Sequence, residues 1–249
     1  MTMTEVQKGG WKRKQVRNEK MKKYEIALFD LDGTISESGE GILDCVKMIF
    51  QEMNRPLPDE KSLAAFIGPP MYDSLKRCGF DHEDADEGVK IYKRNFMEHG
   101  IYKNRVYDGL TEVLAALKAS GVRLGVATTK YQKFADKIIT MLGLDGYFDI
   151  VGGSNSLAGH MPENGEKPRS NKIEVMNYVI GELKRSDTDR IVMLGDTKFD
   201  AEGAAAVGCD FIGCLYGYGT KEEMEQHYTI GNVTFVSSPS EITAILEPV

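Results

Sequence analysis

Cysteine and histidine are scarce in this sequence, and together they form no metal-binding pattern. The chain has four of each in 249 residues. The cysteines make no CxxC pair, and no histidine is spaced with them as zinc sites require. We therefore expect reduced, mostly buried thiols and a cytoplasmic protein. The cysteines are Cys45, Cys78, Cys209 and Cys214.

Long apolar runs are also missing. No run approaches the roughly 20 residues that cross a bilayer. The basic N-terminus is not followed by the apolar segment of a signal peptide. We therefore predict no membrane partner.

Charge is distributed unevenly along the chain. Residues 1–23 carry a net charge of +6, so the remainder carries −13 of the total of −7. A body this acidic argues against a nucleic-acid polymer as partner. The basic segment is either a nucleic-acid arm or a disordered extension, and we favour a disordered tail over residues 1–22. The single tryptophan, Trp11, lies in this tail.

Short apolar runs alternate with helical patterns along most of the chain. This alternation predicts an α/β fold with a doubly wound parallel, Rossmann-like sheet. We assign residues 23–35 and 107–249 to this core. The expected strands are Tyr24–Phe29, Val122–Ala127, Ile191–Leu194, Phe211–Leu215 and Val233–Val236, and the expected helices include Leu110–Leu117, Phe134–Leu142, Lys172–Leu183 and Glu202–Val207.

One connection is far too long for a loop between a strand and a helix. About 70 residues separate the first strand from the next core helix, whereas such loops usually take about 2–6 residues. The segment has helical patterns of its own, at Ile42–Met53 and Asp84–Met97. We therefore predict an inserted all-helical domain over residues 36–106.

The strongest chemical signal is Asp30-Leu31-Asp32-Gly33-Thr34, directly after the first strand. Ligands of a parallel sheet bind outside the carboxyl ends of its strands. Residues two apart in an extended segment point to the same side, so both carboxylates can face one site. A divalent cation between the two carboxylates would offset their mutual repulsion. Gly33 allows a sharp turn, and backbone N–H groups in such a turn can bind phosphate oxygens.

Two weaker signals also follow strands. Asp196 and Asp200 lie in a GDxxxD pattern with the oxygen ligands that suit Mg²⁺, although Asp200 could instead be an N-terminal helix cap. Thr128-Thr129-Lys130 offers hydroxyls and a cation for phosphate oxygens. A cation should also balance this acidic site. The candidates are Lys130, Lys167, Lys172 and Lys198.

The order of these motifs resembles the pattern of the haloacid-dehalogenase superfamily. The motifs are FDLDGT, a strand that ends in threonine, a lysine and GDxxxD. The resemblance implies that Asp30 is a nucleophile forming an aspartyl-phosphate and that Asp32 is the acid/base. It implies that Thr128 supplies the hydroxyl of the family's threonine motif and that Lys172 is the family's catalytic lysine, with Lys167 as the alternative. It places Mg²⁺ on Asp30, Asp32, Asp196 and Asp200, and the helical insert resembles a cap. Phosphate contacts are expected from Leu31, Gly33, Thr34, Thr129 and Lys130.

Finer likeness points to the phosphoglycolate-phosphatase-like branch, and IGCLYGYGTKEEM resembles a subgroup that includes 5′-nucleotidases. The expected function is hydrolysis of a small phosphorylated metabolite, phosphoglycolate or a nucleoside 5′-monophosphate first, by a monomer or homodimer. A phosphotransferase such as a sugar-phosphate mutase is the alternative, and a receiver-like phosphoacceptor is a more distant one. Specificity is expected from the cap, near Gly68–Tyr72 and Lys93–Arg94.

Overall fold

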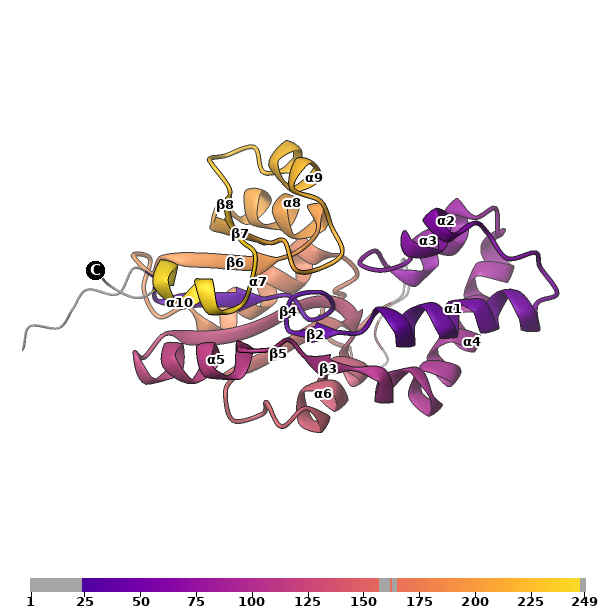
Figure 1. The fold of residues 1–249 in the computed structure, drawn as a ribbon, viewed down its shortest axis with the longest axis horizontal. Coiled ribbons are helices and arrows are strands. Elements are labelled where there is room, and N and C mark those ends of the chain that lie inside the picture. The colour runs from indigo at the N-terminus through magenta and orange to yellow at the C-terminus, as the bar shows by residue number, and fades with distance from the viewer. Residues whose placement is uncertain (1–23, 157–161, 163–164, 247–249) are drawn as a thin grey trace, which may run out of the picture.

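A six-stranded, fully parallel sheet forms the centre of the molecule (Figure 1). The computed structural model describes residues 24–156, 162 and 165–246. The predicted tail and Trp11 lie outside these residues. The strand order is β5-β4-β1-β6-β7-β8, so the chain winds outward from β1 in both directions. The strands are β1 (Ile26–Phe29), β4 (Arg123–Tyr131), β5 (Ile150–Ser154), β6 (Ile191–Gly195), β7 (Asp210–Cys214) and β8 (Thr234–Val236).

Helices cover both faces of the sheet, which explains why its strands are apolar on both sides. Successive residues of β1 alternate between two clusters: Ala27 and Phe29 enter one, Ile26 and Leu28 the other. One face packs against α5 (Leu110–Ala119), α6 (Gln132–Met141) and α10 (Ser240–Leu246), and the other against α7 (Lys172–Leu183), α8 (Lys198–Val207) and α9 (Lys221–His227). The predicted doubly wound α/β fold is confirmed.

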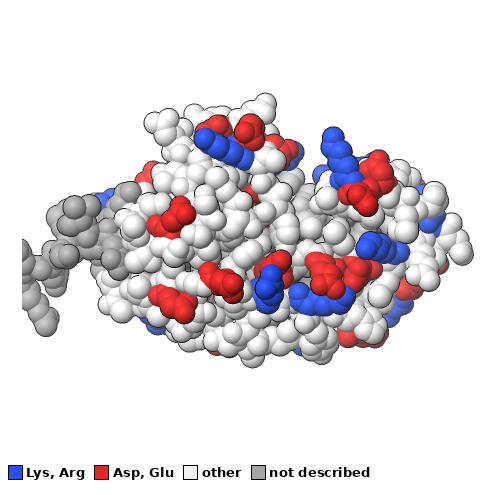
Figure 2. Space-filling view, in the orientation of Figure 1, with Lys and Arg blue, Asp and Glu red and all other residues white. Residues whose placement is uncertain are grey.

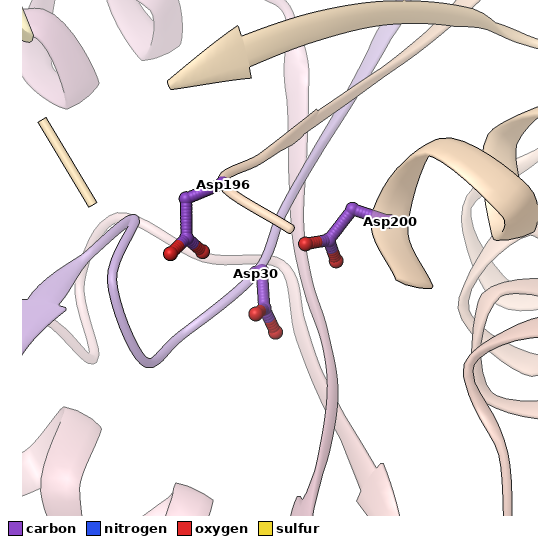
Figure 3. A group of neighbouring side chains, drawn as sticks. All are labelled: Asp30, Asp196 and Asp200. Atoms are coloured by element: carbon purple, nitrogen blue, oxygen red, sulfur yellow. The ribbon is translucent and has the colours of Figure 1, made fainter. Parts of the chain in front are cut away.

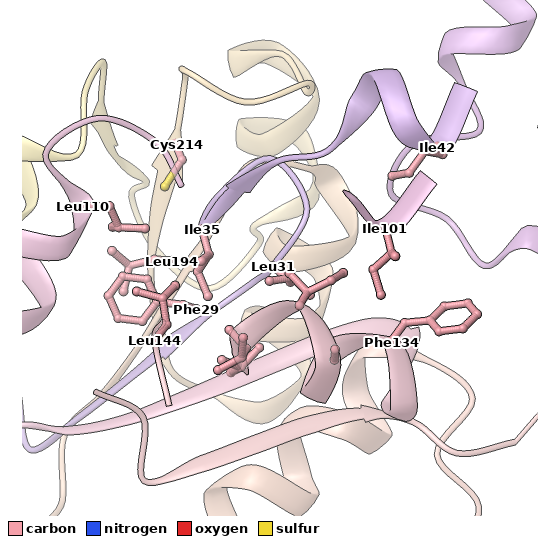
Figure 4. Packing of buried hydrophobic residues seen from close by; sticks show 14 of the residues in the cluster. Phe29, Leu31, Ile35, Ile42, Ile101, Leu110, Phe134, Leu144, Leu194 and Cys214 are labelled. Atoms are coloured by element: carbon pink, nitrogen blue, oxygen red, sulfur yellow. The ribbon is translucent and has the colours of Figure 1, made fainter. Parts of the chain in front are cut away.

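The segment between β1 and α5 forms a separate helical body at one end of the sheet (Figure 1). A two-stranded antiparallel pair of β2 (Ser36–Glu37) and β3 (Arg105–Val106) joins it to the core. Figure 4 shows that one apolar cluster continues from Phe29 and Leu194 to Ile42 and Ile101. The helices of this cap are α1 (Gly39–Glu52), α2 (Glu60–Ala64), α3 (Met71–Arg77), α4 (His82–Glu98) and the 3₁₀ helix η1 (Gly100–Lys103).

Several element boundaries differ from those expected. The strand expected at Val122–Ala127 runs on to Tyr131 as β4, so Thr128–Lys130 belong to its end rather than to a following loop. Strand β5 was not expected, because its sequence IVGGS has only two large apolar residues. Helix α8 begins at Lys198 rather than Glu202. The range 36–106 also includes β2 and β3, so the helical part itself spans Gly39–Lys103.

Surface charge is mixed on the face shown in Figure 2, where Lys and Arg side chains lie beside Asp and Glu. Ion pairs also join the helices of the cap, such as that of Arg94 in α4 with Glu52 in α1. Among the residues coloured there, no basic stripe of the kind that binds a nucleic-acid backbone is visible. Within the described chain, no helix has both the length and the apolarity needed to cross a bilayer.

Candidate active site

Three buried aspartates from separate segments meet at the carboxyl end of the sheet (Figure 3). Asp30 follows β1, Asp196 follows the neighbouring strand β6, and Asp200 lies in the first turn of α8. One carboxylate oxygen from each lies within 4.8 Å of the others. The parallel pairing of β1 and β6 brings residues 166 positions apart in the sequence to one edge.

Lys172 is the cation at the centre of this cluster. It is the first residue of α7 and is 6% exposed. Its Nζ lies 2.7 Å from Asp30 Oδ1 and 2.6 Å from Asp200 Oδ1, and it donates to the carbonyl of Ala127 at 3.0 Å. The rival Lys167 is exposed, and Lys198 pairs with Glu223 instead. The geometry therefore favours Lys172 for the lysine role.

The turn after β1 is shaped by Gly33. Its φ of 87° lies in the left-handed region, and a Cβ added there would approach Asp196 Oδ2 to 2.2 Å. Both the turn and the close approach therefore require glycine. Thr34 Oγ1 donates to Asp196 Oδ1 at 3.2 Å, and the backbone N–H of Tyr218 donates to Asp196 Oδ2 at 2.7 Å. These bonds fix the orientation of the Asp196 carboxylate.

Asp200 combines a structural contact with a place in the cluster. The N-cap of α8 is Thr197, so the alternative that made Asp200 the cap residue is wrong. Asp200 is instead the reciprocal member of a capping box, in which its Oδ2 accepts from the Thr197 N–H at 3.0 Å and from its hydroxyl at 2.8 Å. Its other oxygen, Oδ1, is left to face Lys172.

The remaining predicted residues lie beside this cluster with different roles. Lys130 Nζ contacts both oxygens of Asp32, at 3.1 and 2.9 Å. Thr128 is buried, and its hydroxyl accepts from the Lys130 N–H. Thr129 instead donates to the carbonyl of Gly68 in the cap at 3.1 Å, and the Leu31 side chain belongs to the apolar core. Leu31 can therefore contact phosphate through its backbone alone.

Burial and the neighbouring carboxylates raise the pKa values of two members of this cluster, Asp30 and Asp196. Burial raises the pKa of Asp30 to about 6, Lys172 opposes the rise and Asp200 adds to it. Burial, then Asp200 and Asp30, raise the pKa of Asp196 well above its usual range. Burial lowers the pKa of Lys172, but Asp200 and Asp30 outweigh it and leave the pKa raised. Three carboxylates thus share the one ammonium of Lys172, and the excess charge of the cluster is negative.

This donor set fits a magnesium ion. Mg²⁺ prefers oxygen ligands, binds through a few carboxylates and keeps waters for the rest of its shell. The cluster provides three buried carboxylates with surplus negative charge, together with a turn whose backbone lies against Asp196. A divalent cation would offset both the burial and the repulsion that raise the pKa values of Asp30 and Asp196.

Removing the central ammonium should destabilise the fold. We expect Lys172→Met to lower the free energy of unfolding in EDTA by about 3–5 kcal/mol, because it leaves buried carboxylates without a partner. Urea denaturation followed by circular dichroism measures this change. The control is Lys184→Met, which removes an exposed lysine paired with Asp187. Equal stability of the two variants would show that the Lys172 contacts contribute nothing net.

The raised pKa of Asp30 predicts a pH dependence. Because the folded state binds this proton up to about pH 6 and the unfolded state loses it near its ordinary pKa of 3.8, stability should fall as pH rises between these values. Asp30→Asn removes the titration. In EDTA, the variant should therefore gain stability relative to the parent protein from pH 4 to pH 7 in urea denaturation. The opposite trend would mean that Lys172 outweighs burial.

Two features of the site had no signal in the sequence. Lys130 was a candidate cation for the acidic site, but its pairing with Asp32, 98 positions away, could not be singled out from the sequence. Tyr218 likewise connects Asp196 to the cap, because its hydroxyl accepts from the N–H groups of Ser38 and Gly39 at 2.9 and 2.7 Å. Aromatic residues after a strand are common, so this position could not be singled out.

Several known proteins are similar to this chain in sequence. The protein named tyrosine-protein kinase PtkA of Mycobacterium tuberculosis is 30% identical over 82% of this chain and 67% of its own length. A 5′-nucleotidase of Pseudomonas aeruginosa is 34% identical over 82% of this chain and 89% of its own. A phosphoglycolate phosphatase of Colwellia psychrerythraea is 27% identical over 84% and 92%.

A solved structure has the same architecture. The crystal structure of a predicted phosphatase from Clostridium acetobutylicum superposes with a TM-score of 0.78, at 34% identity, over 89% of this chain and 97% of that one. The model of the haloacid dehalogenase-like hydrolase family matches residues 27–214, a range that contains the acidic cluster and its lysine. The chain belongs to the haloacid dehalogenase-like hydrolase family.

Proposed function

We propose that this protein is a Mg²⁺-dependent phosphomonoester hydrolase that acts through an aspartyl-phosphate on Asp30. The convergence of Asp30, Asp196 and Asp200 around Lys172 carries the proposal. The family match and the relatives named 5′-nucleotidase and phosphoglycolate phosphatase support it. The substrate is a small phosphorylated metabolite, with phosphoglycolate and nucleoside 5′-monophosphates as the first candidates.

In the first step, a carboxylate oxygen of Asp30 attacks phosphorus and the bond from phosphorus to the alcohol oxygen breaks. Asp32 gives its proton to the departing oxygen. Because Lys130 holds Asp32 at 2.9 Å, an anionic phosphoryl group that drew Lys130 to itself would free Asp32 to be protonated. Lys172, beside Asp30, balances charge on the phosphoryl oxygens.

In the second step, Asp32 takes a proton from water, the water oxygen attacks phosphorus, and the bond from Asp30 to phosphorus breaks. This returns Asp30 as carboxylate and releases inorganic phosphate. Mg²⁺, held by Asp30, Asp196, the main-chain carbonyl of Asp32 and, in a supporting role, Asp200, would supply charge stabilisation to the transferring group. Thr128 and the backbone of the Gly33 turn are the proposed phosphate contacts.

Release of free phosphate tests the proposal. The purified protein with Mg²⁺ is offered nucleotides, phosphoglycolate, sugar phosphates and pyrophosphate, and liberated phosphate is measured. Turnover of at least one monoester is expected. If a folded protein with bound Mg²⁺ released no phosphate from any of these compounds, the hydrolase assignment would be rejected.

A phosphotransferase remains the second candidate, and one observation favours it. The relative from Mycobacterium tuberculosis is named a tyrosine-protein kinase. Transfer would use the same attack at Asp30, with a hydroxyl other than water accepting the phosphoryl group in the second step. Isotopically labelled phosphate that appears on an added acceptor, rather than in solution, would identify this activity.

A further inference from the structure

A ligand-sized cavity lies between the cap and the core, next to the acidic cluster. Its volume is about 330 Å³, and Asp32, Thr129, Lys130 and Lys172 line its core side. Small-molecule sites usually measure about 300–1,000 Å³. Under the proposed function, the phosphoryl group occupies the end at Lys172, and the rest of the space receives the leaving group.

Aromatic side chains line this cavity from both the cap and the core. The cap and the core each contribute three aromatic rings to the lining. Aromatic side chains bind a planar ring most favourably, because the ring can pack face-on or edge-on against them. A two-carbon group such as glycolate would leave most of this wall in contact with water. The rings belong to Phe66, Tyr72 and Tyr92 of the cap and to Tyr131, Phe134 and Phe199 of the core.

Among the described residues, Lys93 is the lysine of this cavity that has no carboxylate partner. Three lysines line it; Lys130 is paired with Asp32, and Lys172 with Asp30 and Asp200. Lys93 forms no ion pair with any carboxylate in the described ranges, and its Nζ lies 4.0 Å from the ring centroid of Tyr131. A half-buried ammonium is costly unless its N–H groups are hydrogen-bonded, and an acceptor atom of a ligand would provide such a bond.

The surroundings of Lys93 agree with a ligand-binding role. Burial, and then the nearby Lys133, lower the pKa of Lys93. An acceptor oxygen or nitrogen brought in by a ligand would oppose both effects, because a hydrogen bond from the ammonium stabilises its charged form. The neighbouring Arg94, by contrast, is neutralised by Glu52 on the surface and does not line the cavity.

We infer that the cavity selects phosphomonoesters whose leaving group carries a planar heteroaromatic ring, and that Lys93 is the specificity-determining residue that binds an acceptor atom on that ring. The inference rests on the proposed function and narrows its substrate. Nucleoside 5′-monophosphates have this chemistry, whereas phosphoglycolate and sugar phosphates lack the ring. Tyr131 holds the ammonium over its face, so that Lys93 is positioned before the ligand arrives.

The test compares kcat/KM for nucleoside 5′-monophosphates with kcat/KM for phosphoglycolate. The parent protein should prefer at least one nucleotide by about 10-fold or more, and Lys93→Met should reduce this preference by about 10-fold, the size of one charge-assisted hydrogen bond. The loss should appear mainly in KM, because Lys93 would contact the leaving group rather than the phosphoryl group. The control Lys90→Met, an exposed position on the same helix paired with Glu87, should keep the preference.

A binding measurement keeps this test independent of turnover. In the Asp30→Asn background, adding Lys93→Met should weaken nucleoside 5′-monophosphate binding by about 10-fold, as measured by calorimetry. Equal affinity of the two proteins would overturn the role of Lys93. A preference for phosphoglycolate that Lys93→Met abolishes would also overturn the inference, because Lys93 would then bind a carboxylate, while the hydrolase would stand. Nucleotide binding by the parent protein without any turnover would reject the hydrolase assignment, whereas the role of Lys93 in binding the ring would stand.

Discussion

Asp30→Asn is expected to lower kcat for phosphomonoester hydrolysis by about 10,000-fold or more, the scale seen when a covalent nucleophile is removed. An amide nitrogen or oxygen in the same place is a far weaker nucleophile than a carboxylate. The substitution keeps side-chain volume, and Lys172 keeps its second partner, Asp200. The loss should therefore come from chemistry rather than from unfolding.

Phosphate release under saturating substrate measures this change, and circular dichroism shows whether the fold survives. The matched control is Asp187→Asn, which changes a fully exposed aspartate far from the cluster. It should leave kcat within about twofold, as surface substitutions away from special contacts usually do. An Asp30→Asn protein with more than about a tenth of the parent activity would refute the nucleophile role.

Loss of the magnesium response is the second large effect. In excess EDTA the parent protein should show no turnover, because nothing then balances the surplus charge of the buried carboxylates. Added Mg²⁺ should restore it and raise the free energy of unfolding by about 2.7 kcal/mol at a concentration 100 times its Kd. Asp196→Asn should abolish both responses, because it removes a buried carboxylate that reaches the shared centre of the cluster.

The same substitution should act in the opposite direction on the metal-free fold. Asp196 is fully buried, and Asp200 and Asp30 repel its charge. An asparagine oxygen can still accept from the Tyr218 N–H. In EDTA, Asp196→Asn should therefore melt at a higher temperature than the parent protein, and with Mg²⁺ at a lower one. Turnover in excess EDTA, or an unchanged magnesium shift in Asp196→Asn, would contradict the metal site.

Most strands of the sheet could be predicted from the sequence, because they are short apolar runs bounded by acidic residues and glycines. Asp30 and Asp196 each follow such a run, and parallel strands place these ends at one edge. Strand β5 was not predicted, because glycines at 152 and 153 weaken its apolar pattern. A Cβ at Gly152 would come within 2.3 Å of Val179. Its composition reflects the close packing of α7, and the sequence alone does not display that contact.

The sequence by itself determined the fold class, the helical insert and the acidic cluster, because hydrophobic period and residue type act over a few neighbouring positions. Tertiary structure decided which lysine serves the cluster: Lys172 reaches Asp30 across 142 positions, while Lys167, five residues earlier, stays exposed. It also decided that, within the described part of the chain, Lys130 has a carboxylate partner in the cavity and Lys93 has none. Charge pairing depends on which side chains share a buried space, and only the packing of cap on core fixes that.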